Sequence, residues 1–487
     1  MRQNAVDELP ARAGRGSRAK SRHRASSRAY ARAMVLPSPS DVDVLAIGRE
    51  LSAAMPSASR RPLAALDDKA MDLASQDAQL KAALFRFVDV VPACHSVDDL
   101  AAHLSGFLSE VDDKPAALEQ AMRLGSSRPG RRALGTAAAA GVRHMAHRFI
   151  VGESPQAAAG VLAGLWRNGV TSSVDLLGEA TVTAAEADAY AQRCSEALTT
   201  LTTAAATWPA RPAIERDSAG ILPRANLSVK VSALTPLLRA DAPELGRRDA
   251  APRLRALLRQ AKELGAHLHI DMESYDSREA TADLVLELLA EPEFADGPSA
   301  GVVLQAYLRD SPELADRFVQ WVQDTPRADP LVVRLVKGAY WDHEVVDARQ
   351  HGWTPPVFEV KADSDANFEQ LTRVLLGARD TGSGVRTAIA SHNLRSVAHA
   401  VAVSRAAGHP DADLELQVLR GLGDPLQIAL AATGLRVRTY CPVGDLVAGM
   451  AYLVRRLLEN TSNDSFLHDQ GAGVELERLL AAPGAPA

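Results

Sequence analysis

Residues 332–341 have the sequence VVRLVKGAYW, a short apolar run that ends in a lysine, a glycine and two aromatic residues. A short apolar run bounded by glycine or polar residues is typical of a strand that is buried on both faces. The same pattern recurs along the chain from residue 171, and a long helical segment follows most of the runs. The predicted strands are Thr171–Leu177, Leu227–Ser232, His267–Met272, Val302–Tyr307, Val332–Val336, Arg386–Ala390, Leu414–Leu419 and Val437–Tyr440.

Strands that alternate with helices in this way predict a (β/α)8 barrel, a fold that takes about 250 residues. An open, doubly wound sheet is the alternative. The barrel is favoured because nearly every predicted strand ends in polar residues or glycine, and in a barrel these ends converge on one face, where active sites are built. The predicted helices between the strands include Glu244–Leu264, Ser277–Leu289, Pro312–Gln323, Ala362–Leu376 and Asn393–Ala407.

The chain before the barrel divides into two parts by composition. Residues 1–40 are rich in arginine, serine and alanine, and so few apolar residues predict a disordered segment. Residues 41–141 form an all-α domain that supports or dimerises a distorted barrel at residues 142–468, and residues 469–487 are a tail. The tract Ser126–Ala140 is expected to be a hinge. The predicted helices of the all-α domain are Asp43–Ala54, Leu63–Leu73, Leu80–Val91, Val97–Leu108 and Ala116–Leu124.

Composition narrows the functional classes. The 487 residues carry a formal net charge of −6, which gives no support to nucleic-acid binding, although an arm at residues 1–33 is the residual alternative. The three cysteines, Cys94, Cys194 and Cys441, are odd in number and far apart, which indicates reduced thiols in the cytoplasm. No apolar run approaches the length of about 18 residues that crosses a membrane.

Charged residues inside predicted strands are the first candidate site. Lys230 lies between valines in an inward position, where an amine is either catalytic or pairs with an anion. Asp271 and Glu273 share one face of a strand because side chains alternate with period 2. They form either a structural ion pair with barrel cations or a catalytic pair. Glu179 is a candidate partner for Arg455 or Arg456, and such an ion pair across the barrel mouth would act as a gate.

A predicted helix after residue 444 carries two adjacent arginines. Tyr452, Arg455, Arg456 and Glu459 occur at i, i+3, i+4 and i+7, so they share one helix face. Two guanidinium groups in this arrangement suit a carboxylate or a phosphate, and a solvated surface with a local Arg–Glu pair is the simpler alternative.

Three further groups of residues suggest a flat, anionic cofactor. Gly338 allows close backbone approach beside two cations and two aromatic rings, and the segment of residues 391–393 begins a helix, whose N-terminus attracts anions. Gln305 adds an amide. His267 and His269 have no third ligand at a suitable spacing, so no metal site is expected. The residues of the first two groups are Arg334, Lys337, Gly338, Tyr340, Trp341, Ser391, His392 and Asn393.

These segments together resemble a known family. SVKVSAL, HIDMES, VVLQAY, VRLVKGAYWDHE, SHN, LQVLRGLGDPL and TYCPVGDLVAGMAYLVRRLLENTSNDSF are similar, in order and spacing, to the proline dehydrogenase domain of the proline utilization A family. The resemblance covers residues 148–466 and implies a distorted (β/α)8 barrel that holds FAD without a covalent bond. It also implies oxidation of L-proline to Δ1-pyrroline-5-carboxylate by hydride transfer to flavin N5, the first step of proline catabolism to glutamate.

The resemblance implies specific roles. Lys230, Arg455 and Arg456 would bind the proline carboxylate, and with Asp271 and Tyr440 they form the expected catalytic set. Glu179 matches the family's acidic gate residue. Residues that would line the proline pocket are Lys230, Asp271, Tyr340, Leu419, Tyr440, Tyr452, Arg455 and Arg456. Residues that would contact FAD are Gln305, Arg334, Lys337, Gly338, Ala339, Tyr340, Trp341, Ser391, His392, Asn393, Arg456, Glu459, Ser465 and Phe466.

The expected partners also come from the resemblance. Electrons would pass to a membrane quinone, which implies peripheral contact with the inner face of the cell membrane. No aldehyde dehydrogenase half follows the barrel, so a separate pyrroline-5-carboxylate (glutamate semialdehyde) dehydrogenase is expected, unless the chain is truncated. The alternatives are another flavin barrel similar to methylenetetrahydrofolate reductase, an aldolase that uses Lys230 as a Schiff base, and a non-catalytic barrel.

Overall fold

The computed structural model describes residues 35–56, 77–112, 119–120, 122–123, 127–445, 449 and 474–484. Within these ranges eight parallel strands close into a barrel in the order β1-β10-β9-β8-β7-β6-β5-β4. The predicted barrel is therefore confirmed, and the open-sheet alternative is wrong. The strands are β1 (Val170–Leu176), β4 (Asn226–Lys230), β5 (His267–Asp271), β6 (Ser299–Gln305), β7 (Leu331–Val336), β8 (Val385–Ala390), β9 (Glu415–Leu419) and β10 (Val437–Val443).

Each predicted strand is present, with ends that differ by a few residues. The strand predicted to end at Ser232 ends at Lys230, because residues Val231–Ala233 turn into the short 3-10 helix η3. A two-stranded antiparallel sheet of β2 (Arg216–Asp217) and β3 (Gly220–Ile221), which was not predicted, lies between β1 and β4 in the sequence. In the barrel, β1 pairs with β4 on one side and with β10 on the other, and these two pairings close the sheet.

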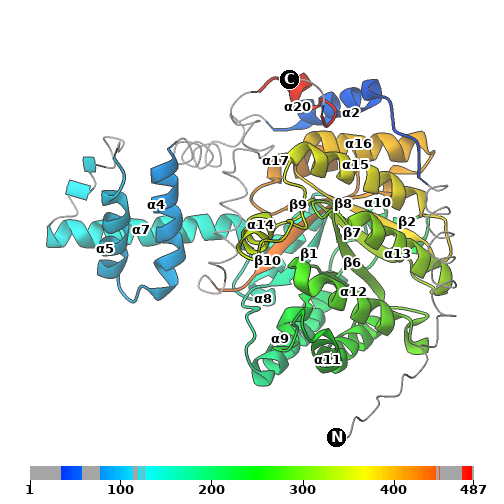
Figure 1. Ribbon diagram of the computed structural model, residues 1–487, viewed down its shortest axis with the longest axis horizontal. Coiled ribbons are helices and arrows are strands. Elements are labelled where there is room, and N and C mark those ends of the chain that lie inside the picture. The colour runs from blue at the N-terminus through cyan, green and yellow to red at the C-terminus, as the bar shows by residue number, and fades with distance from the viewer. Residues whose placement is uncertain are drawn as a thin grey trace, which may run out of the picture.

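Helices surround the barrel, as Figure 1 shows. They connect the strands and cover their outward faces, so the closed sheet is buried between its own interior and a ring of helices. These helices are α8 (Pro155–Arg167), α9 (Ala184–Ala206), α10 (Pro212–Glu215), α11 (Pro243–Leu264), α12 (Tyr275–Leu289), α13 (Ser311–Asp324), α14 (Trp341–Gln350), α15 (Lys361–Gly377), α16 (Leu394–Ala406) and α17 (Asp424–Ala432).

The interior of the barrel is polar. Arg334 on β7 donates to Ser228 on β4 (3.2 Å) and lies 3.4 Å from Ser173 on β1. Neither strand is a neighbour of β7, so these side chains meet across the inside of the barrel. The alternate positions, such as Leu268 and Ile270 on β5, point outward and belong to the main hydrophobic core under the helices. Barrels of this type usually fill the interior with branched apolar residues, so a charged interior must compensate its own charges.

The helices before the barrel include a long one that was not foreseen. Helices α4 (Ala78–Val90), α5 (Val97–Ser109) and α7 (Arg128–Phe149) stand beside the barrel in Figure 1, with the short η2 (Val91–Ala93) after α4. The hinge predicted at Ser126–Ala140 is wrong, because residues from Arg128 onward form the first half of α7. The Ser127 side chain caps this helix by accepting from the Gly130 amide (3.2 Å), and the alanine-rich sequence after it favours helix.

Helix α2 (Asp41–Ala54) packs on the barrel, against α16 and α17. Its partner at the C-terminal end of the chain is the short α20 (Leu476–Leu479), and Figure 1 shows the two side by side. Arg395 on α16 joins both segments, since it donates to Asp41 (2.8 Å) and to the Leu480 carbonyl (3.0 Å) while it pairs with Glu369 (2.8 Å).

Some predicted elements lie wholly or partly outside the described residues. They are residues 1–34 of the segment predicted to be disordered (residues 1–40), the predicted helix at residues 63–73 and most of the predicted helix at residues 116–124. Among the helices that the structure describes, none combines the length and the apolar character needed to cross a membrane.

The position of Arg395 leads to a stability prediction. We expect Arg395→Met to lower the free energy of unfolding by about 3 kcal/mol, because it leaves the largely buried Glu369 carboxylate without its guanidinium partner. Arg405→Met is a matched control on the same helix, since Arg405 pairs with Asp411 near the surface, and it should cost less than about 1 kcal/mol. Chemical denaturation of both variants measures the difference; equal losses would contradict the proposed importance of Arg395.

Candidate functional site

The C-terminal ends of the barrel strands bring a set of charged side chains together. Lys230 ends β4 and Asp271 ends β5, and the two residues are direct neighbours in the strand register. Asp175 on the adjacent β1 points to the same interior space. Tyr440 on β10 reaches Asp271 across the mouth. The sequence places a charged or hydroxyl side chain at each of these positions, and closure of the sheet makes them one cluster.

Lys230 is surrounded by carboxylates. Its Nζ atom lies 2.9 Å from Asp175 Oδ1, 2.7 Å from Glu179 Oε2 and 3.8 Å from Asp271 Oδ2, and the side chain is almost fully buried. Burial by itself lowers the pKa of Lys230, but the carboxylates, Asp175 above all, raise it well above its ordinary value. A Schiff-base lysine needs a lowered pKa. The geometry therefore argues against the aldolase alternative and favours a permanent ammonium.

Asp271 is held by two donors. Arg334 Nη1 donates to its Oδ1 and the Tyr440 hydroxyl donates to its Oδ2, both at 2.7 Å. The Arg334 guanidinium also lies 5.4 Å from the centre of the Tyr440 ring, within reach of a cation–π interaction. Burial raises the pKa of Tyr440 well above its ordinary value, so the phenol keeps its proton and remains a donor. Asp271 is thus fixed in orientation.

Glu273 does not pair with a barrel cation in the way that Asp271 does. Strand β5 ends at Asp271, so the period-2 argument that put both carboxylates on one face does not extend to residue 273. Burial raises the pKa of Glu273, and a hydrogen bond from Ser232 partly opposes this. The Glu273 carbonyl accepts from the Gln305 side chain (2.8 Å). Of the two carboxylates, Asp271 is the one that forms an ion pair with Lys230 (3.8 Å) among the described residues.

The end of β7 forms a second region beside this cluster. Gly338 has a positive φ of 136°, and a Cβ atom there would collide with the Tyr307 ring, so only glycine fits. Lys337 pairs with Asp365, which also accepts from Lys361 (2.9 Å). Burial lowers the pKa of Lys337, and Asp365 opposes that shift.

The neighbouring strand end supplies a helix N-terminus. Asn393 caps α16 by accepting from the Ser396 amide (3.2 Å), and the Ser391 hydroxyl accepts from the Asn393 amide (3.1 Å). His392 Nε2 accepts from the Leu419 amide (2.9 Å), so its imidazole is unprotonated at that nitrogen. These contacts fix the orientation of the predicted cofactor residues just before this helix.

Several features fit a bound cofactor at this edge of the barrel. The Gln305 side-chain oxygen is buried and has no hydrogen-bond partner within the described part of the chain. Gly338 provides backbone that a ligand can approach, and Lys337 provides a cation. The Trp341 ring is 38% exposed and anchored by a bond from its Nε1 to the Phe358 carbonyl (2.8 Å). A flat molecule with an N–H or O–H donor for the Gln305 oxygen and anionic groups near Lys337 would fit this edge of the barrel.

The structure brings part of the predicted site together. Lys230, Asp271, Tyr440 and Glu179 form one cluster with Arg334. Other predicted residues lie at the ends of neighbouring elements: Leu419 ends β9 in register with Tyr440, and Ala339 and Tyr340 link β7 to α14. The predicted residues that lie outside the described part are Tyr452, Arg455, Arg456, Glu459, Ser465 and Phe466.

Asp175 belongs to the Lys230 cluster and was not predicted from the sequence. It holds Lys230 from inside the barrel and is almost completely buried. The available signal was an acidic residue inside the strand sequence TSSVDLL, four positions before Glu179, and a buried carboxylate in a strand requires a cation partner.

The two strand histidines form a separate pair toward the other end of the barrel. His267 Nε2 lies 3.1 Å from His269 Nδ1, and His267 Nδ1 lies 2.9 Å from Ser299 Oγ. Burial, together with nearby arginines, lowers the pKa of His267 to about 3 and that of His269 well below its ordinary value. Over the described ranges no group of three or more His, Cys, Asp or Glu side chains could hold a metal ion.

Comparison with known proteins identifies the family. The proline dehydrogenase family matches residues 158–469, and the proline utilization A N-terminal domain matches residues 41–149. The chain therefore belongs to the proline dehydrogenase family, as its sequence motifs indicated. The resemblance stated from the motifs is confirmed.

Individual relatives belong to the same family. The bifunctional protein PutA of Salmonella typhimurium is 32% identical over 352 residues, which is 70% of this chain and 25% of the relative. The proline dehydrogenase of Deinococcus radiodurans is 30% identical over 324 residues, which is 66% of this chain and 89% of the relative. The chain thus spans about a quarter of the length of the bifunctional relatives that it matches.

A solved structure gives the same result for the fold. Proline utilization A from Bdellovibrio bacteriovorus, inactivated by N-propargylglycine, superimposes with a TM-score of 0.82 at 36% identity. The match covers 91% of this chain and 44% of that one.

The buried histidines lead to a prediction about pH. Both are neutral in the folded protein, whereas the unfolded chain binds protons below the ordinary His pKa of 6.5. Stability is therefore full above pH 6.5 and falls as the pH drops toward 3, by about 1.4 kcal/mol per pH unit for each histidine. Urea unfolding of His267→Gln between pH 6.5 and 4.5 should show a shallower fall than the wild type. The exposed His343→Gln is the control, and identical slopes in the two variants would refute this explanation.

Proposed function

We propose that this chain is an FAD-dependent L-proline dehydrogenase that oxidises L-proline to Δ1-pyrroline-5-carboxylate. The observation that carries the proposal is the permanently charged Lys230 ammonium beside the fixed Asp271 carboxylate at the C-terminal mouth of the barrel. Membership in the proline dehydrogenase family supports the substrate. An amino acid carries both a carboxylate and an amine, and this mouth offers groups of both charges.

Lys230 would bind the substrate carboxylate with Arg455 and Arg456. Two carboxylates already contact its ammonium, and they differ in accessibility. The Asp175 side chain is 3% exposed, whereas that of Glu179 is 24% exposed. Glu179 is therefore the one that can move aside, and the substrate carboxylate would take its place. In this exchange Glu179 would act as the gate, because it leaves Lys230 when the substrate carboxylate binds.

Asp271, Tyr440 and the pocket residues Tyr340, Leu419 and Tyr452 would position the ring of the substrate. Because Arg334 and Tyr440 hold both oxygens of Asp271, this carboxylate provides a fixed wall of the pocket. The substrate amine must be unprotonated to give up a hydride equivalent from its neighbouring carbon, so the rate should rise with pH. Orientation of this kind can supply about 7–11 kcal/mol of the barrier reduction.

FAD, when bound, supplies the hydride acceptor at its N5 position. The residues suited to hold it are those at the ends of β6, β7 and β8, whose free amide oxygen, glycine backbone and cation were described above. Arg456, Glu459, Ser465 and Phe466 would complete its binding. The described residues of this set are Gln305, Arg334, Lys337, Gly338, Ala339, Tyr340, Trp341, Ser391, His392 and Asn393.

The proposed place of the reaction is the first step of proline catabolism to glutamate. Electrons would pass to a membrane quinone, which requires a cytoplasmic protein that contacts the inner face of the cell membrane peripherally. A separate glutamate semialdehyde dehydrogenase would consume the product.

A spectrum of the purified full chain tests the proposal. Anaerobic addition of L-proline should bleach the flavin band at about 450 nm. The Arg455→Met variant should keep the flavin, since Arg455 is not among the residues expected to contact FAD, and should lose most of the bleaching, because one of the two guanidinium groups that would bind the carboxylate is gone. Bound flavin that L-proline does not bleach in the wild type would reject proline as the substrate, and protein without flavin would reject the cofactor.

The role of Lys230 has its own test. We expect Lys230→Met to lower kcat/KM for L-proline about 10- to 100-fold, mainly through KM, because one charged hydrogen bond to the carboxylate is lost. Lys262→Met removes a lysine that pairs with Asp296 at the surface and should change neither constant. Steady-state kinetics with an artificial electron acceptor measures both variants; an unchanged KM in Lys230→Met would remove Lys230 from the substrate site.

A further inference from the structure

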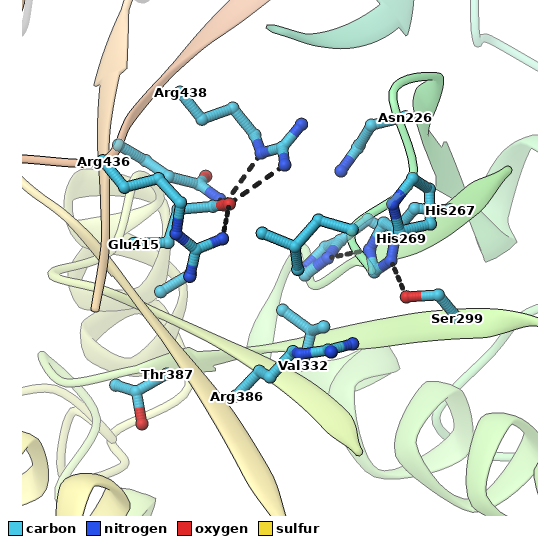
Figure 2. A pocket seen from close by; sticks show the side chains of 14 residues that line it. Asn226, His267, His269, Ser299, Val332, Arg386, Thr387, Glu415, Arg436 and Arg438 are labelled. Carbon is cyan, nitrogen blue, oxygen red and sulfur yellow. Dashed lines mark hydrogen bonds and ion pairs between the residues drawn. The ribbon is translucent and has the colours of Figure 1, made fainter. Parts of the chain in front are cut away.

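A cavity inside the barrel, at the end opposite to the mouth, is too small for a substrate. Its free space is about 20 Å³, and roughly 10–15 Å³ is needed to hold one water molecule. Figure 2 shows three arginines, Arg386, Arg436 and Arg438, among the side chains that surround it. Under the proposed function, a five-membered ring with a carboxylate therefore binds at the mouth, in a pocket whose shape depends on the segments that follow the strands.

The segment between β5 and α12 carries one wall of that pocket. Strand β5 ends at Asp271 and α12 begins at Tyr275, so only three residues separate the proposed pocket residue from the helix. So short a connection transmits a movement of the helix end to Asp271. The position of this wall therefore depends on what holds the first turn of α12.

The first amide of α12 is bound by a side chain from another helix. The Ser274 hydroxyl, at the N-cap position, lies 3.4 Å from Ser277 Oγ and caps no amide of α12 within the described part of the chain. Instead, the Tyr275 amide donates to Glu344 Oε1 on α14 (2.7 Å). A carboxylate at a helix N-terminus satisfies a free amide and interacts favourably with the helix dipole. Glu344 thus supplies the cap that α12 does not provide for itself.

Glu344 also belongs to the opposite edge of the pocket. It lies in the first turn of α14, and its own amide donates to the Tyr340 carbonyl (3.0 Å). One side chain therefore joins the segment 338–341 after β7 to the segment 271–275 after β5. Strand β6 lies between these two strands, so no strand pairing sets the distance between the segments directly.

The surroundings of Glu344 suit a hydrogen-bond acceptor better than a charge. The residue is only 6% exposed. Burial raises the pKa of Glu344, and Asp276 and Asp347 add to this rise, whereas the Tyr275 amide and His343 oppose it. A glutamine keeps an acceptor oxygen without a charge, so it should be able to replace Glu344 at this position.

Other contacts keep α12 in place when Glu344 is changed. The Tyr275 hydroxyl lies 3.3 Å from Asp310 Oδ2, and Arg278 Nη2 donates to the same oxygen (2.8 Å). Gln305 holds the Glu273 carbonyl from the end of β6 (2.8 Å). Variants of Glu344 should therefore fold, and their effect should be limited to the position of the segment after β5.

We propose that Glu344 is a positioning residue of the substrate site. By capping α12 from α14, it sets the distance between the Asp271 wall and the edge formed by Tyr340 and the flavin. This inference rests on the proposed function, because it concerns the alignment of the substrate ring with the cofactor.

Hydrogen exchange tests the cap without turnover. In the purified full chain, Glu344→Ala should make the Tyr275 amide exchange about 10-fold faster, since its acceptor is lost. Glu344→Gln should keep most of the protection. Mass spectrometry of peptides that cover residues 271–279 measures the exchange. An exchange rate in Glu344→Ala equal to that of the wild type would contradict the cap.

The rate of flavin reduction tests the positioning role. At saturating L-proline under anaerobic conditions, Glu344→Ala should bind flavin but reduce it about 10-fold more slowly, because the ring is less well aligned. Its KM should change less than its kcat, since Lys230 still binds the carboxylate. Glu344→Gln should stay within about 3-fold of the wild type. Stopped-flow absorbance measures the reduction.

The matched control is another helix cap. Asp77 accepts from the Leu80 amide (2.6 Å) at the start of α4, outside the barrel, and Asp77→Ala should change neither the exchange of residues 271–279 nor the reduction rate. Flavin that L-proline reduces equally fast in the wild type and in Glu344→Ala would overturn the inference and leave the proposed function intact. Equal losses in the alanine and glutamine variants would overturn the capping explanation. Wild-type flavin that L-proline does not reduce would reject the proposed function and the positioning role together.

Discussion

The ion pair between Arg334 and Asp271 is the interaction on which the barrel interior depends. It joins β7 to β5 across the inside of the barrel at 2.7 Å, and the same guanidinium reaches Ser228 on β4. Asp271 in turn orients Tyr440 on β10. One arginine thus links strands on opposite sides of the barrel. Breaking a buried pair of this kind costs about 3–5 kcal/mol because a charge is left uncompensated. A single side chain of this network therefore cannot move away without that cost.

The distribution of charge along the barrel axis follows from the same constraint. At the mouth the cations Lys230 and Arg334 meet three carboxylates, those of Asp175, Glu179 and Asp271. At the other end, three arginines meet the carboxylates of Glu415, Asp217 and, at 3.8 Å, Asp329. Among the described residues the mouth therefore has an excess of negative charge, whereas the cations and carboxylates at the other end are equal in number. Under the proposed function, Arg455 and Arg456 are the cations that the mouth lacks.

The sequence predicted the barrel and the faces of its strands, but not the partners of the charged residues. Alternation with period 2 puts Lys230 on the inside, and the apolar neighbours Val229 and Val231 make this clear. Which carboxylate it meets depends on closure, because Asp175 reaches Lys230 only when β1 pairs with β4.

The errors had different causes. Residues 126–140 were predicted to be a hinge, whereas a serine cap and a run of alanines, both local signals, make a helix from Arg128 onward. Nothing local in the sequence of α2 indicates that it leaves the other helices and docks on α16, since that depends on Arg395, more than 300 positions away. Period and capping are local properties, but docking and charge pairing are set by contacts between distant segments.

Substrate binding at Lys230, as proposed, is best understood as an exchange of carboxylates. A buried ammonium that waited unpaired for its substrate would cost several kcal/mol in the free enzyme. Asp175, which is fully buried, supplies a constant partner, and Glu179 supplies one that the solvent can reach. When a substrate carboxylate replaces Glu179, the charge on Lys230 stays compensated in both states, so the contribution of Lys230 to the binding energy is the difference between two similar ion pairs. A ligand without a carboxylate would have to displace Glu179 and leave the ammonium short of one partner. The same arrangement that stabilises the free enzyme therefore selects for an anionic group at this position.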